Sequence, residues 1–213
     1  MLGLANLFSL LNLFSGLMAI SRLMSGDIYN SVRFFVISLI SDGLDGTIAR
    51  REEKTSEIGK NLDSLSDLVS FGVYPLFFSL EKIPEEFNLF SYVFVLCGAL
   101  RLARFNVLPP SDKFVGLPIP AAGSMLVFSS LEVSGYLLLA FLIVLSILMV
   151  SEVEYHSLKG RDRELILLGI LLLLVLVYPT KFSRLLLILL LIYLISPVIL
   201  RFLPSLVRNI LPR

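Results

Sequence analysis

Charged residues, cysteine and histidine are all scarce in this chain of 213 residues. Only 16% of the residues are charged and 56% are hydrophobic, whereas soluble domains carry roughly 25% charged residues, so an ordinary soluble globule is excluded. The single cysteine, Cys97, excludes an internal disulfide. The 18 basic and 17 acidic residues nearly cancel, so overall charge gives no indication of nucleic-acid binding.

Long apolar runs occupy most of the chain, and those from Leu165 to Val177 and from Leu185 to Ile195 are apolar on every face. A transmembrane β-barrel would alternate apolar and polar positions instead. The pattern therefore predicts an all-α fold, a polytopic membrane helix bundle forming one domain over residues 1–213. Because about 20 apolar residues cross a membrane as a helix, the runs predict eight spans, at 4–24, 30–50, 58–80, 88–107, 117–133, 135–151, 164–179 and 183–202.

The stretch from Leu117 to Ser151 must be divided to give eight spans. As one helix, its 35 residues would measure roughly 52 Å, against a membrane core of about 30 Å. Glu132 and Gly135 offer a break. The division also places 13 of the 18 Lys and Arg residues on one side, whereas a single span gives 9 on each. Because cytoplasmic loops hold the basic excess, we expect an integral cell-membrane protein with both termini cytoplasmic.

Four aspartates fall inside the second and third predicted spans, where an ionised carboxylate costs a few kcal/mol unless it is partnered. They are Asp42, Asp45, Asp63 and Asp67. At about 100° per residue, Asp42 and Asp45 share a face of one helix, and Asp63 and Asp67 lie one turn apart on the next. A short connection makes these helices an antiparallel hairpin, so the four carboxylates can face one another.

Oxygen ligands without a nearby His or Cys favour hard cations such as Mg²⁺ or Mn²⁺, with Ca²⁺ as an alternative occupant. Four carboxylates suffice for two bridged ions, and such a pair clamps phosphoryl oxygens. Arg50, just beyond Asp45, suits a phosphate. The alternative is that the aspartates form buried ion pairs with Arg50, Arg51 and Lys60, although these lie at the hairpin tip, where solvent competes.

The run Asp42-Gly-Leu-Asp45-Gly46-Thr-Ile-Ala49-Arg50, then eight residues, then Gly59-Lys-Asn-Leu-Asp63-Ser-Leu-Ser-Asp67 resembles a known signature. It is that of the CDP-alcohol phosphatidyltransferase family, and every position is matched. The resemblance implies a six-helix catalytic core, two divalent cations, and transfer of a phosphatidyl group from a CDP-linked lipid to an alcohol with release of CMP. It also implies a homodimer, which is common in the family.

The resemblance assigns roles to the aspartates. Asp42 and Asp63 would each bridge both cations, Asp45 would ligate the first and Asp67 the second. Asp67 would also be the catalytic general base, a role that suits the deprotonation of an attacking hydroxyl.

The CDP-lipid is expected to lie against small residues and one arginine of the same hairpin, namely Gly46, Ala49, Arg50 and Gly59. On the first helix, Ser9 and Asn12 fall on one side, from which they would reach the nucleotide or the cations. Polar packing between helices explains these two residues nearly as well.

Further motifs, which end near residue 125, resemble the phosphatidylserine synthase branch of the family. They are the run from Ala5 to Gly16, in which Ala5 stands where proline is common, Arg101-Leu-Ala-Arg104-Phe-Asn106, and Phe114-Val-Gly116-Leu-Pro118-Ile-Pro120. The branch implies L-serine as acceptor and CDP-diacylglycerol or CDP-archaeol as donor. Arg101 and Arg104, one turn apart, are candidates for binding the serine carboxylate or a phosphate, although a basic anchor at the membrane edge is an equal alternative.

Three rival functions use similar residues. A transferase of the same family could take glycerol phosphate or an inositol phosphate, which should need a denser basic pocket. An intramembrane prenyltransferase usually carries its acidic clusters on helices that are separated in sequence. A cation transporter also places acidic residues in a membrane, but it does not need the Gly46, Ala49, Arg50 and Gly59 set.

Overall fold

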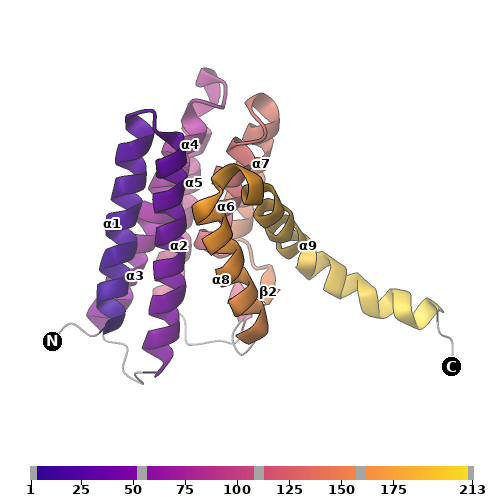
Figure 1. Ribbon diagram of the computed structural model, residues 1–213. Helices are drawn as coiled ribbons and strands as arrows, with labels where there is room; N and C mark the ends of the chain where they lie inside the picture. The colour runs from indigo at the N-terminus through magenta and orange to yellow at the C-terminus, as the bar shows by residue number, and fades with distance from the viewer. Residues whose placement is uncertain (1–3, 52–56, 108–112, 157–161, 211–213) are drawn as a thin grey trace.

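The computed structural model describes residues 4–51, 57–107, 113–156 and 162–210, and in them the apolar runs are helical (Figure 1). In chain order, the α-helices are α1 (Leu4–Met24), α2 (Ile28–Arg51), α3 (Glu57–Asp67), α4 (Tyr74–Leu80), α5 (Asn88–Val107), α6 (Ile119–Ser130), α7 (Gly135–Val150), α8 (Asp162–Val177) and α9 (Pro179–Ile210). A π-helix, η1 (Leu68–Val73), joins α3 to α4, and a 3₁₀ turn, η2 (Glu85–Phe87), precedes α5.

Several predicted boundaries are confirmed. The first and fourth predicted spans coincide with α1 and α5. The doubtful stretch is broken between Ser130 and Gly135, where Gly135 adopts a positive φ of 66° and donates its N–H to the Lys82 carbonyl at 2.7 Å. The last helix differs, because α9 continues to Ile210 rather than ending at 202. The prediction ended the span where the apolar run meets its first charged residue. A helix can continue past that point, because charged residues are compatible with a helix that leaves an apolar environment.

Helix α1 has its polar side chains inside and its apolar side chains outside. Its buried residues are Asn6, Ser9, Asn12, Ser15, Gly16 and Ala19. Its exposed residues include Leu7, Phe14 and Leu17, all more than half exposed. In water this orientation would be unfavourable, since apolar area would stay solvated. It is the orientation expected of a helix whose outer face meets lipid.

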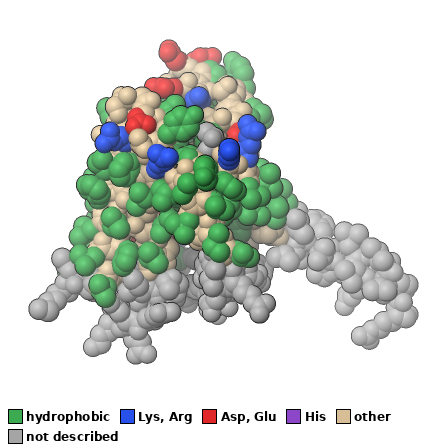
Figure 2. Space-filling view, viewed as in Figure 1, with side chains coloured by type: hydrophobic (Ala, Val, Ile, Leu, Met, Phe, Trp, Pro, Cys, Tyr) green, Lys and Arg blue, Asp and Glu red, His purple; other side chains and the backbone are tan. Residues whose placement is uncertain are grey.

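Two helical segments, Leu4–Met24 and Glu85–Val107, are long and apolar enough to cross a membrane by length and composition. Only 33% and 28% of their apolar windows are buried, whereas the core helix of a soluble protein would be mostly covered. Figure 2 shows hydrophobic side chains across the middle of one face and charged ones gathered toward the upper end. The chain is therefore a mostly helical membrane protein.

The centre of the bundle is α6, which is enclosed by other helices. Its buried residues run without a break from Ala122 to Ser130, and Phe128 stacks edge-on against Phe35 of α2 at 6.0 Å between ring centroids. On its other side, Gly123 lies so close to the Phe71 carbonyl of η1 that a Cβ would overlap it. The core thus fixes η1, and with it the end of α3, against α6.

The structure also contains a small two-stranded sheet, which the all-α prediction did not include. Strand β1 (Lys113–Val115) pairs antiparallel with β2 (Glu154–His156), with Phe114 opposite Tyr155. Next to β1, Gly116 has a φ of 78° and donates its N–H to Val153 O at 2.8 Å, and Pro118 caps α6. Gly116 and Pro118 thus form the entry from β1 into α6.

The helices alternate in direction along one long axis. In Figure 1 the start of α1, the end of α2, the start of α3 and β2 lie toward the lower end, whereas the turns from α1 to α2 and from α8 to α9 lie toward the upper end. The acidic faces of α2 and α3 therefore belong to the lower half of the bundle.

Candidate active site

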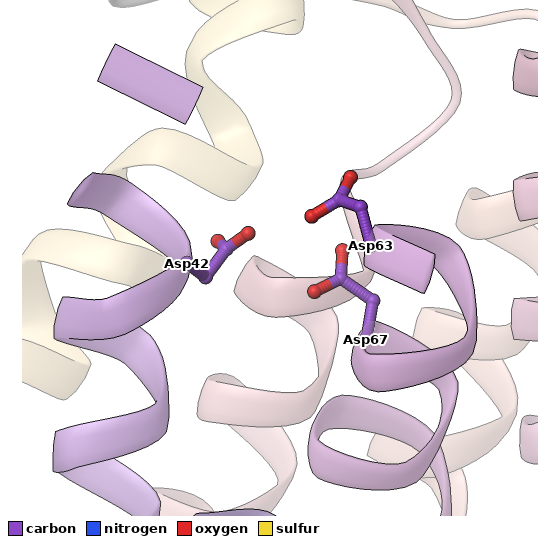
Figure 3. Close-up of side chains that lie close together, drawn as sticks. All are labelled: Asp42, Asp63 and Asp67. Atoms are coloured by element: carbon purple, nitrogen blue, oxygen red, sulfur yellow. The ribbon is translucent and has the colours of Figure 1, made fainter. Parts of the chain in front are cut away.

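Three of the four predicted aspartates converge where α2 faces α3. Figure 3 shows Asp42 extending from one helix toward Asp63 and Asp67 on the other. The carboxylates of all three offer oxygen atoms within 4.8 Å of one another. Asp67 is buried, with 6% of its surface exposed, and the other two are half-buried. The predicted approach of the two acidic faces is confirmed for these three residues.

Asn12 of α1 completes the buried side of this cluster. Its Nδ2 donates a hydrogen bond to Asp67 Oδ1 at 3.0 Å, and its backbone carbonyl accepts a 3.0 Å bond from Ser70 Oγ. Asn12 is fully buried, yet its Oδ1 has no hydrogen-bond partner among the described residues. An orphaned amide oxygen beside three clustered carboxylates forms an oxygen-only donor set with excess negative charge. These residues fit divalent cations such as Mg²⁺ or Mn²⁺.

The π-helix η1 begins immediately after Asp67 and sets the geometry of α3 against α1. π-helical turns are rare and are frequently found at functional sites. Here η1 presents Ser70 to Asn12, and Gly16 of α1 lies against Ser70 with no room for a Cβ. The small residues of α1 thus allow a close approach that places Asn12 in contact with Asp67.

The two candidate arginines of α5 differ sharply in their surroundings. Arg101 is buried, with 6% of its surface exposed, and lies within electrostatic range of Asp67. The guanidinium of Arg104 instead donates to three backbone carbonyls, those of Val115 at 3.1 Å, Val150 at 3.3 Å and Ser151 at 3.1 Å. Arg104 therefore links α5 to the end of α7 and to β1.

A second link joins α3 to α5 near the aspartates. Lys60 Nζ donates to the Asn106 carbonyl at 2.5 Å, and Asn106 Nδ2 donates to Ser64 Oγ at 2.9 Å. Lys60, which the ion-pair alternative would place on the aspartates, contacts the end of α5 here. The bonds fix the distance between the acidic face of α3 and the helix that carries Arg101.

The other predicted site residues lie on α1, α2 and α3. Asp45, Gly46, Ala49 and Arg50 continue α2 as helix, but their side chains lie outside the described residues. Gly59 lies in the first turns of α3. Ser9 is buried on the inner face of α1, and its hydroxyl donates to the Ala5 carbonyl at 3.4 Å.

The sequence patterns did not single out Tyr155 or Tyr193. Tyr193 of α9 lies within electrostatic range of Arg101, and its ring contacts that of Tyr155. No spacing rule links α9 to α5 across about 90 residues of chain, so composition and helical periodicity could not identify them.

The fold and the site define a helical membrane protein with an oxygen-rich acidic centre. The family model for CDP-alcohol phosphatidyltransferases matches residues 2–153, more than half of the chain. The chain therefore belongs to the CDP-alcohol phosphatidyltransferase family, and the transporter alternative does not describe it.

Several curated relatives share most of the chain. A CDP-diacylglycerol–serine O-phosphatidyltransferase of Methanocaldococcus jannaschii is 40% identical over 149 residues, which cover 69% of this chain and 70% of that protein. An enzyme of the same name from Helicobacter pylori is 36% identical over 170 residues, with 72% of each chain covered. An archaetidylserine synthase of Methanothermobacter thermautotrophicus is 38% identical over 169 residues, covering 75% of this chain and 72% of that protein.

Proposed function

We propose that this chain is an enzyme that transfers a phosphatidyl group, or its ether-lipid counterpart, from a CDP-linked lipid to the hydroxyl of L-serine, releasing CMP. The observation that carries the proposal is the convergence of Asp42, Asp63 and Asp67, with oxygen atoms within 4.8 Å, in a membrane protein of this family. The names of the relatives, which specify serine as acceptor, support the choice of substrate.

In the proposed site, Asp42, Asp63 and Asp67 would hold two divalent cations together with Asp45. When bound, such cations neutralise the diphosphate and stabilise the charge that develops on it. Calcium would occupy the site as well, because it takes the same oxygen ligands. The buried position of Asp67 and its bond from Asn12 keep the carboxylate oriented toward the shared space.

The proposed reaction forms one bond and breaks one bond at phosphorus. The serine hydroxyl oxygen attacks the phosphorus attached to the lipid, its proton passes to the Asp67 carboxylate, and the bond from that phosphorus to CMP breaks. Asn12 donates to Asp67 Oδ1, which leaves the other carboxylate oxygen to accept the proton. Asp67 is thus both general base and cation ligand in this proposal.

The CDP-lipid is proposed to lie along the lower part of α2 and the start of α3. Gly46, Ala49 and Gly59 would let the nucleotide approach the backbone, and Arg50 would bind a phosphate. Ser9 and Asn12, which face inward from α1, would border the same space. The orphaned Asn12 Oδ1 supports a partner there.

We further propose eight spans with both termini and the active site on the cytoplasmic side, which is supported by the excess of Lys and Arg that the predicted spans place on one side of the membrane. Helix α6 has 12 residues and rises only about 18 Å, less than the membrane core of about 30 Å. Because α6 is enclosed by other helices, its ends are covered by protein rather than lipid. The homodimer that the family resemblance implies stays a prediction.

A panel of acceptors tests the proposed function. The purified enzyme with CDP-diacylglycerol and Mn²⁺ should release CMP when L-serine is added, and it should release none above background with glycerol 3-phosphate or inositol phosphate. Among the described residues, Arg101 is the basic residue that interacts electrostatically with Asp67. An acceptor that brings an extra phosphate should need further basic residues beside Arg101. Comparable CMP release from serine and from glycerol 3-phosphate would overturn the proposal.

A further inference from the structure

Arg101 is a buried cation without a dedicated partner. Its side chain is 94% covered by protein, given its 6% exposure, and its Nε has no hydrogen-bond partner among the described residues. It lies within electrostatic range of Asp67, yet no salt bridge or hydrogen bond joins the two in the part of the chain that is described. Burying a charge is costly unless it is paired and hydrogen-bonded. Arg101 therefore has the properties of a residue that awaits an anionic ligand.

Two tyrosines from the last third of the chain, Tyr155 and Tyr193, are connected to the surroundings of Arg101. Tyr193 of α9 is within electrostatic range of the guanidinium. Tyr155 of β2 is 1% exposed, and its ring contacts that of Tyr193 at 5.5 Å between centroids with 38° between planes. The contact holds the Tyr193 ring in place. Arg101 thus lies within electrostatic range of both Asp67 and Tyr193, and the Tyr193 ring packs on that of Tyr155.

We propose that Arg101 and Tyr193 form the acceptor subsite, in which the Arg101 guanidinium binds the carboxylate of the amino-acid acceptor and Tyr155 positions Tyr193. The proposal rests on the proposed function and deepens it. A planar guanidinium matches a carboxylate with two parallel hydrogen bonds. Because Arg101 lies within electrostatic range of Asp67, an acceptor bound to the guanidinium by its carboxylate would lie near the proposed base.

Arg104 differs from Arg101 in its hydrogen bonds. Although it lies one turn from Arg101 on the same helix, its guanidinium already donates to three backbone carbonyls. A ligand would have to displace these bonds. The two arginines cannot be distinguished by sequence spacing, but their hydrogen bonds assign a structural role to Arg104 and leave Arg101 for the ligand.

An oxyanion at Arg101 could come from two sources, the carboxylate of the acceptor or a phosphate of the CDP-lipid. The two sources are distinguished by measuring the Michaelis constants for both substrates. The purified full-length enzyme in detergent, with Mn²⁺ and CDP-diacylglycerol, is assayed for CMP release with serine and with serinamide, in which an amide replaces the carboxylate. Arg101→Gln removes the charge, Arg101→Lys keeps the charge without the planar fork, and Arg184→Gln is the control. Arg184 is an exposed arginine of α9 that pairs with Glu132 at 2.8 Å.

The wild type should use serine with a much lower KM than serinamide. Arg101→Gln should raise the KM for serine by about 10- to 100-fold, the effect of losing hydrogen bonds to a charged group, and leave the KM values for serinamide and CDP-diacylglycerol near those of the wild type. Arg101→Lys should give an intermediate KM for serine. Arg184→Gln should match the wild type in all three values.

Two results would overturn the subsite. If Arg101→Gln and Arg101→Lys keep the full preference for serine over serinamide, Arg101 does not bind the carboxylate. If they raise the KM for CDP-diacylglycerol instead, the bound oxyanion is a donor phosphate. A wild type that releases CMP with another alcohol but not with serine would instead refute the proposed function, so the two failures are distinguishable.

Tyr193 is tested by a matched pair of variants. Tyr193→Phe keeps the ring contact with Tyr155 and removes the hydroxyl, and it should raise the KM for serine by about 3- to 10-fold, the effect of one neutral hydrogen bond. Tyr155→Phe, which keeps the same ring contact, should leave this KM within about twofold. An unchanged KM for serine in Tyr193→Phe would remove the Tyr193 hydroxyl from the subsite.

Discussion

Helices α1 and α6 are both short of charged residues and both bury serines, yet only α6 also buries large apolar side chains, whereas α1 buries two asparagines. Helix α1 buries Asn6, Asn12 and several small residues and exposes its leucines. Helix α6 buries Met125, Leu126 and Phe128 and makes aromatic contacts. Contact with lipid explains why the outer face of a helix is apolar, but it does not explain why the inner face carries polar side chains. In α1 that reason is Asn12, which contacts Asp67.

The largest expected effect on activity is that of replacing Asp67, the carboxylate that Asn12 of α1 contacts. Asp67→Asn should reduce CMP release with serine by about 10²- to 10⁴-fold, because the general base is lost. The chain should still fold, since an asparagine can accept the bond from Asn12. Glu132→Gln, at the turn that begins α7, is the control and should keep wild-type turnover. Near-normal turnover of purified Asp67→Asn would exclude Asp67 as the base.

Asn12 itself tests whether the polar inner face of α1 serves the site. Asn12→Ala should lower turnover by about 10- to 100-fold, the cost of removing a residue that orients a metal ligand. Ser146→Ala is the matched control on α7, because Ser146 is also buried and its hydroxyl donates only within its own helix, to Leu142 O at 2.9 Å. Equal losses in the two variants would mean that Asn12 contributes to packing alone.

Gly16 tests the close approach of α1 to η1. A Cβ at this position would overlap Ser70, so Gly16→Ala should destabilise the protein by about 1–3 kcal/mol through overpacking, seen as a lower Tm in detergent. Gly169→Ala in α8 is the control, because nothing lies within 4 Å of its Cβ position and alanine favours a helix. If Gly16→Ala has the higher Tm of the two, the tight packing of α1 on η1 is wrong.

The smallest effect lies outside both inner faces, at the turn between α1 and α2. The pKa of Asp27 is lowered because the Asn30 side chain, and then its backbone N–H, donate hydrogen bonds to the carboxylate. A lowered pKa in the folded state adds stability above the pKa of the unfolded chain, and this stability is lost as the pH falls through the folded value. Asp27→Ala should therefore lower the Tm slightly at neutral pH, and the difference should shrink below about pH 4. A difference that is constant from pH 7 to pH 3 would contradict this.

The sequence predicted the helices and the meeting of the acidic faces well, because both depend on local periodicity. It predicted α1, α5 and the break near Gly135 from apolar runs and polar breaks. It could not predict η1, since the turn that follows Asp67 is set by packing against Gly16 and Gly123 rather than by a residue pattern.

Contacts between distant segments were also beyond the sequence. The pairing of β1 with β2 joins strands about 40 residues apart, and the approach of Tyr193 to Arg101 joins α9 to α5. The different surroundings of Arg101 and Arg104 depend on where α7 ends. Each of these requires the three-dimensional packing of the bundle, which helical periodicity alone does not determine.

The carboxylates of α2 and α3, supported by the polar face of α1, are proposed to bind two divalent cations for transfer of a lipid phosphoryl group. The most direct measurement is a Mn²⁺ titration of the purified, chelator-treated enzyme, followed by electron paramagnetic resonance together with CMP release. We expect two bound Mn²⁺ ions per chain, fewer in Asp63→Asn, and activity that is absent after chelation and returns with the metal. Full CMP release by a chelator-treated enzyme that binds no Mn²⁺ would contradict it.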